Sequence, residues 1–136
     1  MATIHLIIVI ATGLLVLYSD EQAAAWVLGK KPTLPAARIA FLHKAIAIGL
    51  TLLLLTGGYL YLRGVEAYLT LTPFVVKMVA VAALIINTWA IDRLGHVATV
   101  REFASLSHRE RVPLFISGAV SFAGWVTAII CGLIIA

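Results

Sequence analysis

The side chains with the clearest potential for chemistry are histidines and one aspartate near the ends of long apolar segments. His43 and His96 fall on neighbouring segments, and two such histidines can ligate one haem iron. Haem b bound by His43 and His96 is therefore one hypothesis, although His43 lies inside its segment and His96 at the end of the next. His43, Asp92 and His96 also supply ligand types that suit a metal ion, but their spacing matches no metal-binding motif.

Two further polar residues, Lys77 and Asn87, interrupt the third apolar segment. An amide near mid-membrane should face the protein, so Asn87 is expected to form an interhelical hydrogen bond. Lys77 can extend outward to the headgroups, or it can face inward and pair across the bundle, where Glu66 is the acidic residue nearest in topology. In the second case Lys77 and Asn87 would line a transport path.

Catalytic motifs are absent from the sequence. It contains no GxSxG, no HExxH and no glycine-rich phosphate loop. Cys131 is the only cysteine, which excludes an intrachain disulfide. We also find no acidic residue in the middle of an apolar segment that would couple transport to protons. These features favour a non-enzymatic protein.

Composition places these residues in a membrane protein. The 136 residues are 62% hydrophobic and only 12% charged, whereas soluble domains have about 25% charged residues. Continuous apolar runs of roughly 20 residues indicate membrane-spanning helices. We expect an all-α, integral membrane four-helix bundle that forms a single domain over 1–136, with helices at about 3–28, 35–62, 73–95 and 108–135.

The net charge of +4 is concentrated in two loops. Basic residues flank the first and third connections, at Lys30, Lys31, Arg38, Lys44, Arg93, Arg101, Arg109 and Arg111. Because basic loops stay in the cytoplasm, both termini are expected outside. The charge is thus a topology signal and does not indicate a nucleic-acid partner. The expected partners are the lipid bilayer and a second membrane protein or a second copy of the chain.

Local signals predict helix ends and close packing. Gly29 should cap the first helix, and Trp26 should lie among lipid headgroups. Ser107 and Glu110 match a capping box at the start of the last helix. Small residues then recur every three or four positions, which allows close helix approach, at Ser117, Ser121, Gly124, Ala128 and Gly132.

Several stretches resemble a family of small, uncharacterised bacterial inner-membrane proteins with four helices. They are SDEQAAAWVLGKKPTL, LHKAIAIGLTLLLLTGG, TPFVVKMVAVAALIINTWAIDRLGHVAT and RVPLFISGAVSFAGW. The layout is more distantly similar to the membrane part of copper resistance D-type proteins, although only Met1 and Met78 are present and soft sulfur ligands suit Cu(I). The closer resemblance implies a multi-pass location in the inner membrane of bacteria and transfers no site residues.

Three functional hypotheses follow. The first is a non-enzymatic membrane protein that binds a partner or a small ligand. The second is a haem- or metal-binding electron-transfer protein that uses His43 and His96. The third is a small transporter or channel, for which a hydrated cavity must reach Asn87.

Overall fold

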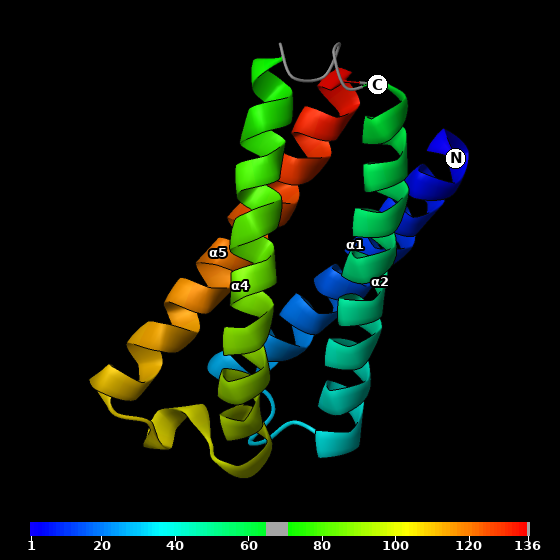
Figure 1. Ribbon diagram of the computed structural model, residues 1–136. Helices are drawn as coiled ribbons and strands as arrows, with labels where there is room; N and C mark the ends of the chain where they lie inside the picture. Colours follow the sequence, from blue (N-terminus) through cyan, green and yellow to red (C-terminus); the bar gives the residue numbers. More distant parts are fainter. Residues whose placement is uncertain (65–70, 136) are drawn as a thin grey trace.

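The computed structural model describes residues 1–64 and 71–135, and it confirms the predicted all-α bundle. The described residues form four long helices, one short 3-10 helix and no strand (Figure 1). The elements are α1 (Ala2–Val27), α2 (Ala36–Arg63), α4 (Thr72–Val100), η1 (Phe103–Ser105) and α5 (His108–Ile135). All four long helices are long and apolar enough to cross a membrane. The chain is therefore a small polytopic membrane protein.

The long helices run alternately up and down, so both termini lie at one end of the bundle (Figure 1). We call this the terminal end, and we call the opposite end, which holds residues 28–35 and 101–107, the loop end. α1 packs most extensively on α2, and α4 on α5, whereas α2 and α4 share a smaller contact. In Figure 1, α2 and α4 stand nearly upright while α1 and α5 run obliquely.

Small residues permit the close contacts within both helix pairs, as predicted. A Cβ on Gly49 would lie 2.3 Å from Thr12 Oγ1 across the α1–α2 contact. A Cβ on Gly124 would lie 2.8 Å from Leu84 Cγ across the α4–α5 contact. Of the predicted stripe in α5, Ser117, Ser121 and Gly124 are buried. In both pairs, a glycine therefore accommodates a side chain of the neighbouring helix.

Gly29 ends α1 as the sequence predicts. Its φ of +74° is the one positive value among the described residues. Lys30 N donates to Ala25 O at 2.9 Å, and Gly29 N donates to Trp26 O at 3.1 Å. These two bonds form a Schellman motif, which satisfies carbonyls that the helix end leaves free. The chain turns there towards α2.

Two expectations about the loop end were wrong. α4 continues to Val100 instead of ending near residue 95. Ala98, in this additional turn, is buried, and its carbonyl oxygen accepts a hydrogen bond from Leu34 N of the first loop at 2.8 Å. Trp26 does not lie among headgroups, because it is only 3% exposed and its Nε1 donates to Arg101 O at 2.9 Å. This hydrogen bond and the packing around it place the indole in the loop-end core.

Candidate functional site

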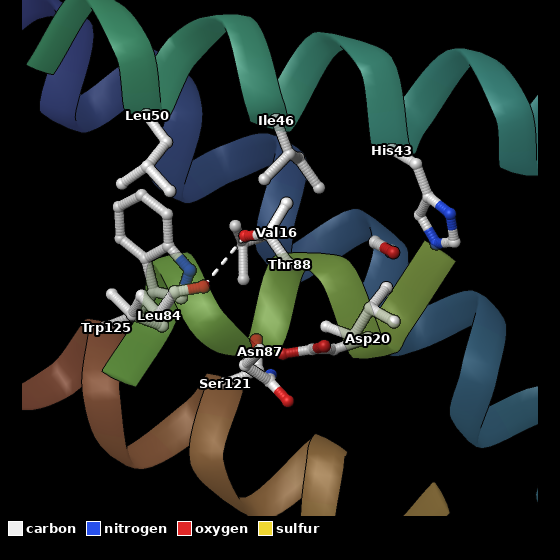
Figure 2. A pocket seen from close by; sticks show the side chains of 12 residues that line it. Val16, Asp20, His43, Ile46, Leu50, Leu84, Asn87, Thr88, Ser121 and Trp125 are labelled. Carbon is white, nitrogen blue, oxygen red and sulfur yellow. Dashed lines mark hydrogen bonds between the residues drawn. The ribbon is translucent and has the colours of Figure 1, made fainter. Parts of the chain in front are cut away.

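A cavity of about 60 Å³ lies between the four long helices (Figure 2). Each helix contributes to its wall, and the lining residues are Val16, Ser19, Asp20, His43, Ile46, Leu50, Leu84, Asn87, Thr88, Ile91, Ser121 and Trp125. About half of these side chains are polar. A partly polar cavity of this size has room for a few water molecules, and it is far too small for a porphyrin.

Asp20 is the acidic side chain among the residues that line this cavity. It follows Thr12 and Val16 at four-residue intervals, and both of those residues are buried. Asp20 therefore lies on the inward face of α1, whereas the adjacent Glu21 is exposed. The Asp20 carboxylate forms no hydrogen bond or ion pair with any residue that the structure describes.

Sequence reasoning missed Asp20 because the sequence predicts the first helix but does not show which face of that helix turns inward. The helix continues to Val27, so Asp20 lies seven residues from its end, or about 10 Å. The sequence offers only a weak signal, which is that Asp20 follows the polar Thr12 by eight residues and so shares its helix face. An intramembrane acidic residue on the bundle face is a functional candidate by default.

Asn87 and Ser117 confirm the predicted interhelical hydrogen bond. Asn87 Nδ2 donates to Ser117 O at 2.9 Å, and Ser117 Oγ donates to Asn87 Oδ1 at 2.8 Å. Both side chains are 7% exposed. Asn87 thus joins α4 to α5 and also forms part of the cavity wall.

Thr88 presents mainly an oxygen acceptor to the cavity. Its hydroxyl donates its proton to Leu84 O at 2.8 Å, one turn earlier in α4 (Figure 2). The lone pairs of the hydroxyl oxygen remain free for another donor or for a cation. Thr88 therefore adds an acceptor to the wall of the cavity.

A groove lies between α2 and α4, and the His43 side chain lines both this groove and the cavity. This side chain is 17% exposed, and Nδ1 lies 3.9 Å from Oδ1 of Asp92, whose side chain is 83% exposed. Gly95 makes room for the ring, since a Cβ there would lie 2.5 Å from His43 Cε1. His43 can form an ion pair with Asp92 when the imidazole is protonated.

The structure brings together two of the three predicted metal ligands. His43 and Asp92 are neighbours, but His96 is exposed and lines neither the cavity nor the groove. Within residues 1–64 and 71–135, no group of three His, Cys, Asp or Glu side chains could hold a metal ion. Haem or metal binding by His43 and His96 stays a prediction.

Lys77 lies apart from Asn87, at the terminal end. Its side chain is partly buried, and Nζ would be 3.3 Å from a Cβ on Gly132 of α5. Lys77 thus faces α5, although it forms no hydrogen bond or ion pair with the described residues. Glu66, its expected acidic neighbour, lies outside the described residues. Lys77 lines neither the cavity nor the groove, so the two polar residues of α4 do not share one path.

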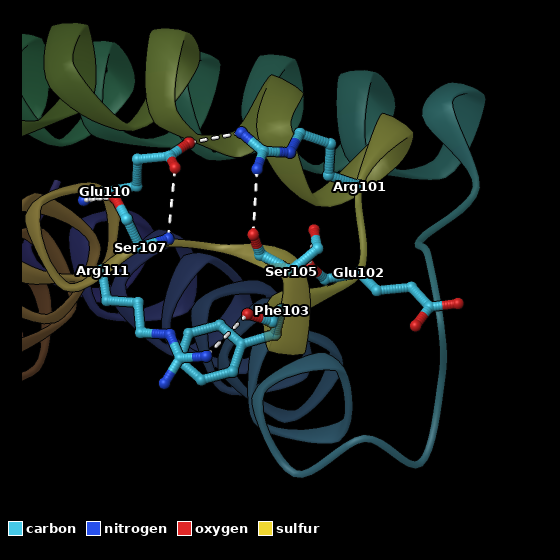
Figure 3. A network of polar contacts seen from close by, with 7 residues as sticks. All are labelled: Arg101, Glu102, Phe103, Ser105, Ser107, Glu110 and Arg111. Atoms are coloured by element: carbon cyan, nitrogen blue, oxygen red, sulfur yellow. Dashed lines mark hydrogen bonds and ion pairs between the residues drawn. The ribbon is translucent and has the colours of Figure 1, made fainter.

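A polar network fixes the connection that closes the loop end (Figure 3). Arg101 forms an ion pair with Glu110 and donates to Ser105 O at 3.0 Å. Ser107 N donates to Glu110 Oε1 at 3.1 Å, and Glu110 N donates to Ser107 Oγ at 3.3 Å, which is the predicted capping box. Arg111 stacks over the Phe103 ring at 4.6 Å. This network positions the start of α5, which carries Ser121 to the cavity.

Searches for related proteins give no guide to this site, because no protein family, no curated protein and no solved structure matches the chain. The resemblance to four-helix inner-membrane proteins stays a prediction. The cavity defines the candidate site by its own geometry.

Proposed function

We propose that the protein is a non-enzymatic, ligand-binding membrane protein that binds a small monovalent cation in the cavity between its helices. The observation that carries this proposal is the Asp20 carboxylate, which lines the cavity without a protein partner among the described residues. Asp20 is partly buried, and withdrawing a charge from water without a partner costs free energy. A bound cation would remove that cost.

The other polar groups of the cavity suit a cation better than an anion. Thr88 has already donated its proton to a backbone carbonyl, and Ser117 occupies only part of the acceptor capacity of Asn87 Oδ1. Ser19 and Ser121 add two hydroxyl oxygens. Hard oxygen ligands around one carboxylate match an ion of the alkali-metal class or ammonium.

The volume of the cavity and the charge of Asp20 restrict the class of ligand further. A cavity of about 60 Å³ admits an ion with a few waters but no organic solute of metabolite size. The single negative charge of Asp20 is matched by one positive charge. We infer from the two basic loops that the loop end faces the cytoplasm, which would make the cavity accessible from that side of a bacterial inner membrane.

The test measures thermal unfolding in a neutral detergent while Na⁺, K⁺ or ammonium replaces choline at constant ionic strength. Ligand that binds only the folded state raises the melting temperature with concentration. We expect this rise in the wild type and in Glu21→Gln, which removes an exposed charge next to the site. Asp20→Asn should abolish it. An equal response of Asp20→Asn, or no difference between these cations and choline, would contradict the proposal.

A small transporter or channel is a second candidate, and one observation favours it. His43 and Thr88 line both the cavity and the groove between α2 and α4, so these two side chains form the wall between them. Rotation of either side chain would connect the cavity to the outside of the bundle. Cation flux into liposomes that contain the protein tests this candidate: flux that Asp20→Asn abolishes supports it, and retention of the ion gradient contradicts it.

A further inference from the structure

The groove between α2 and α4 has a different character from the cavity. Its volume is about 730 Å³, more than ten times that of the cavity, and it opens to the side of the bundle. It exists because α2 and α4 share a smaller contact than either neighbouring pair. The small side chain of Ala47 on the α2 wall also leaves room there. A groove that opens sideways between two membrane-spanning helices faces lipid.

Two cationic side chains flank the groove without protein partners. Lys44 extends from α2 and Arg93 from α4, and both are exposed. Neither forms a hydrogen bond or an ion pair with a described residue. Asp92, the acidic side chain of the lining, is directed to His43. The groove therefore presents two positive charges and one negative charge, which favours an anionic occupant.

The depth of these two residues allows their side chains to reach the phosphate region of a bilayer. Lys44 lies eight residues after the start of α2, which is about 12 Å along the helix. Arg93 lies seven residues before the end of α4, which is about 10 Å. Helices of 28 and 29 residues exceed a hydrocarbon core of about 30 Å. If the helices are centred, each end extends only about 6–7 Å beyond the core. The Cα atoms of Lys44 and Arg93 then lie a few ångströms inside it, and their long side chains can extend to the headgroups.

The wall of the groove becomes apolar further from the loop end. Trp89 lies one turn from Arg93 towards the bundle centre and is 76% exposed. Ala47 lies one turn from Lys44 in the same direction. An acyl chain can lie along these two residues while its headgroup stays beside the cations. Tryptophan is also common at this level of membrane proteins.

We propose that the groove between α2 and α4 binds an anionic phospholipid, with its phosphate between Lys44 and Arg93 and one acyl chain against Ala47 and Trp89. Basic pockets between membrane-spanning helices bind anionic headgroups in this way. The site is separate from the cation cavity, since neither Lys44 nor Arg93 lines the cavity. It therefore does not depend on the proposed function.

The test compares phosphatidylglycerol with phosphatidylcholine of identical acyl chains, titrated into the purified protein and resolved by native mass spectrometry. We expect the wild type to prefer phosphatidylglycerol. Lys44→Gln and Arg93→Gln should each weaken its binding about fivefold, the contribution of one basic residue at a membrane surface. Arg109→Gln is the matched control, because Arg109 is exposed at the same end and does not line the groove. It should bind as the wild type does.

A steric variant tests the acyl-chain part of the site. Ala47→Phe fills the groove without a change in charge, and it should weaken the binding of both lipids while the melting temperature stays close to that of the wild type. Four results would overturn the proposal: equal binding of the two lipids, an equal loss in Arg109→Gln, displacement of the lipid by inorganic phosphate at equal concentration, or dimers in place of lipid-bound monomers. The last result would mean that a second copy covers the groove.

Discussion

Gly124→Ala should destabilise the bundle, because the added methyl group has no room. Its carbon would lie 2.8 Å from both Cγ and Cδ2 of Leu84, whereas carbon atoms in contact are normally about 3.5–4.0 Å apart. Leu84 is 4% exposed and packs with Val16, Leu50 and Trp125. It therefore cannot retreat without disturbing that cluster. Overpacking of this kind costs about 1–3 kcal/mol.

Gly118→Ala provides the matched control on the same helix. A Cβ on Gly118 meets no atom within 4 Å, so only the intrinsic preference of helices for alanine acts there, worth roughly 0.5–1 kcal/mol. The same preference offsets part of the clash at Gly124. We expect Gly118→Ala to be neutral or slightly stabilising and Gly124→Ala to be less stable than it by about 2 kcal/mol.

The assay is reversible unfolding in mixed micelles of a mild detergent and dodecyl sulfate, followed by far-ultraviolet circular dichroism. A double mutant isolates the clash, because Leu84→Ala removes the atoms that the new methyl group meets. Gly124→Ala should cost much less in the Leu84→Ala background than in the wild type. Equal stability of Gly124→Ala and Gly118→Ala would refute the close contact between Gly124 and Leu84. The same argument predicts a larger loss for Gly124→Leu.

Three further predictions concern polar contacts and use the same unfolding assay. Ser117→Ala removes the donor to Asn87 Oδ1 and should cost about 0.5–1.5 kcal/mol; unchanged stability would mean that another donor replaces the hydroxyl. Trp26→Phe keeps an aromatic ring in the loop-end core but loses the hydrogen bond to Arg101 O, which should cost about 1 kcal/mol. Glu110→Gln removes the charge of the ion pair with Arg101 and leaves one acceptor oxygen for both Arg101 and Ser107 N. Both contacts are exposed, so the change should cost no more than about 1 kcal/mol, and a larger loss would show that the loop-end network is more cooperative than its exposure suggests.

The helices were predictable because each apolar segment is long and its ends carry local signals. Gly29 has the left-handed conformation that its sequence context indicates. Ser107 and Glu110 form the predicted capping box at the start of α5, in which each backbone N–H donates to the other residue's side chain. The interhelical role of Asn87 also followed from the cost of burying a free amide. These features depend on residues near in sequence or on the solvent, so the sequence alone contains them.

The candidate site was less predictable because it depends on which face of each helix turns inward. Periodicity is a weak guide in helices that are apolar on all sides, since lipid and the bundle interior both accept apolar residues. Asp20 was therefore overlooked, and Trp26 was assigned to the headgroups, although both face protein. The groove between α2 and α4 arises from the distance between two helices, which no single segment specifies.

The polar side chains of this bundle fall into those that have a hydrogen-bond partner and those that have none among the described residues. Thr51, Thr56 and Thr88 each donate a hydroxyl proton to a carbonyl one turn earlier, so their own helices satisfy them. Asp20 and Lys77 have no such partner among the described residues, and they cannot neutralise each other. Asp20 lies seven residues from the loop end of α1, whereas Lys77 lies five residues from the terminal end of α4. Both side chains are only partly buried, so each charge can be compensated locally, and we propose that a cation in the cavity compensates Asp20.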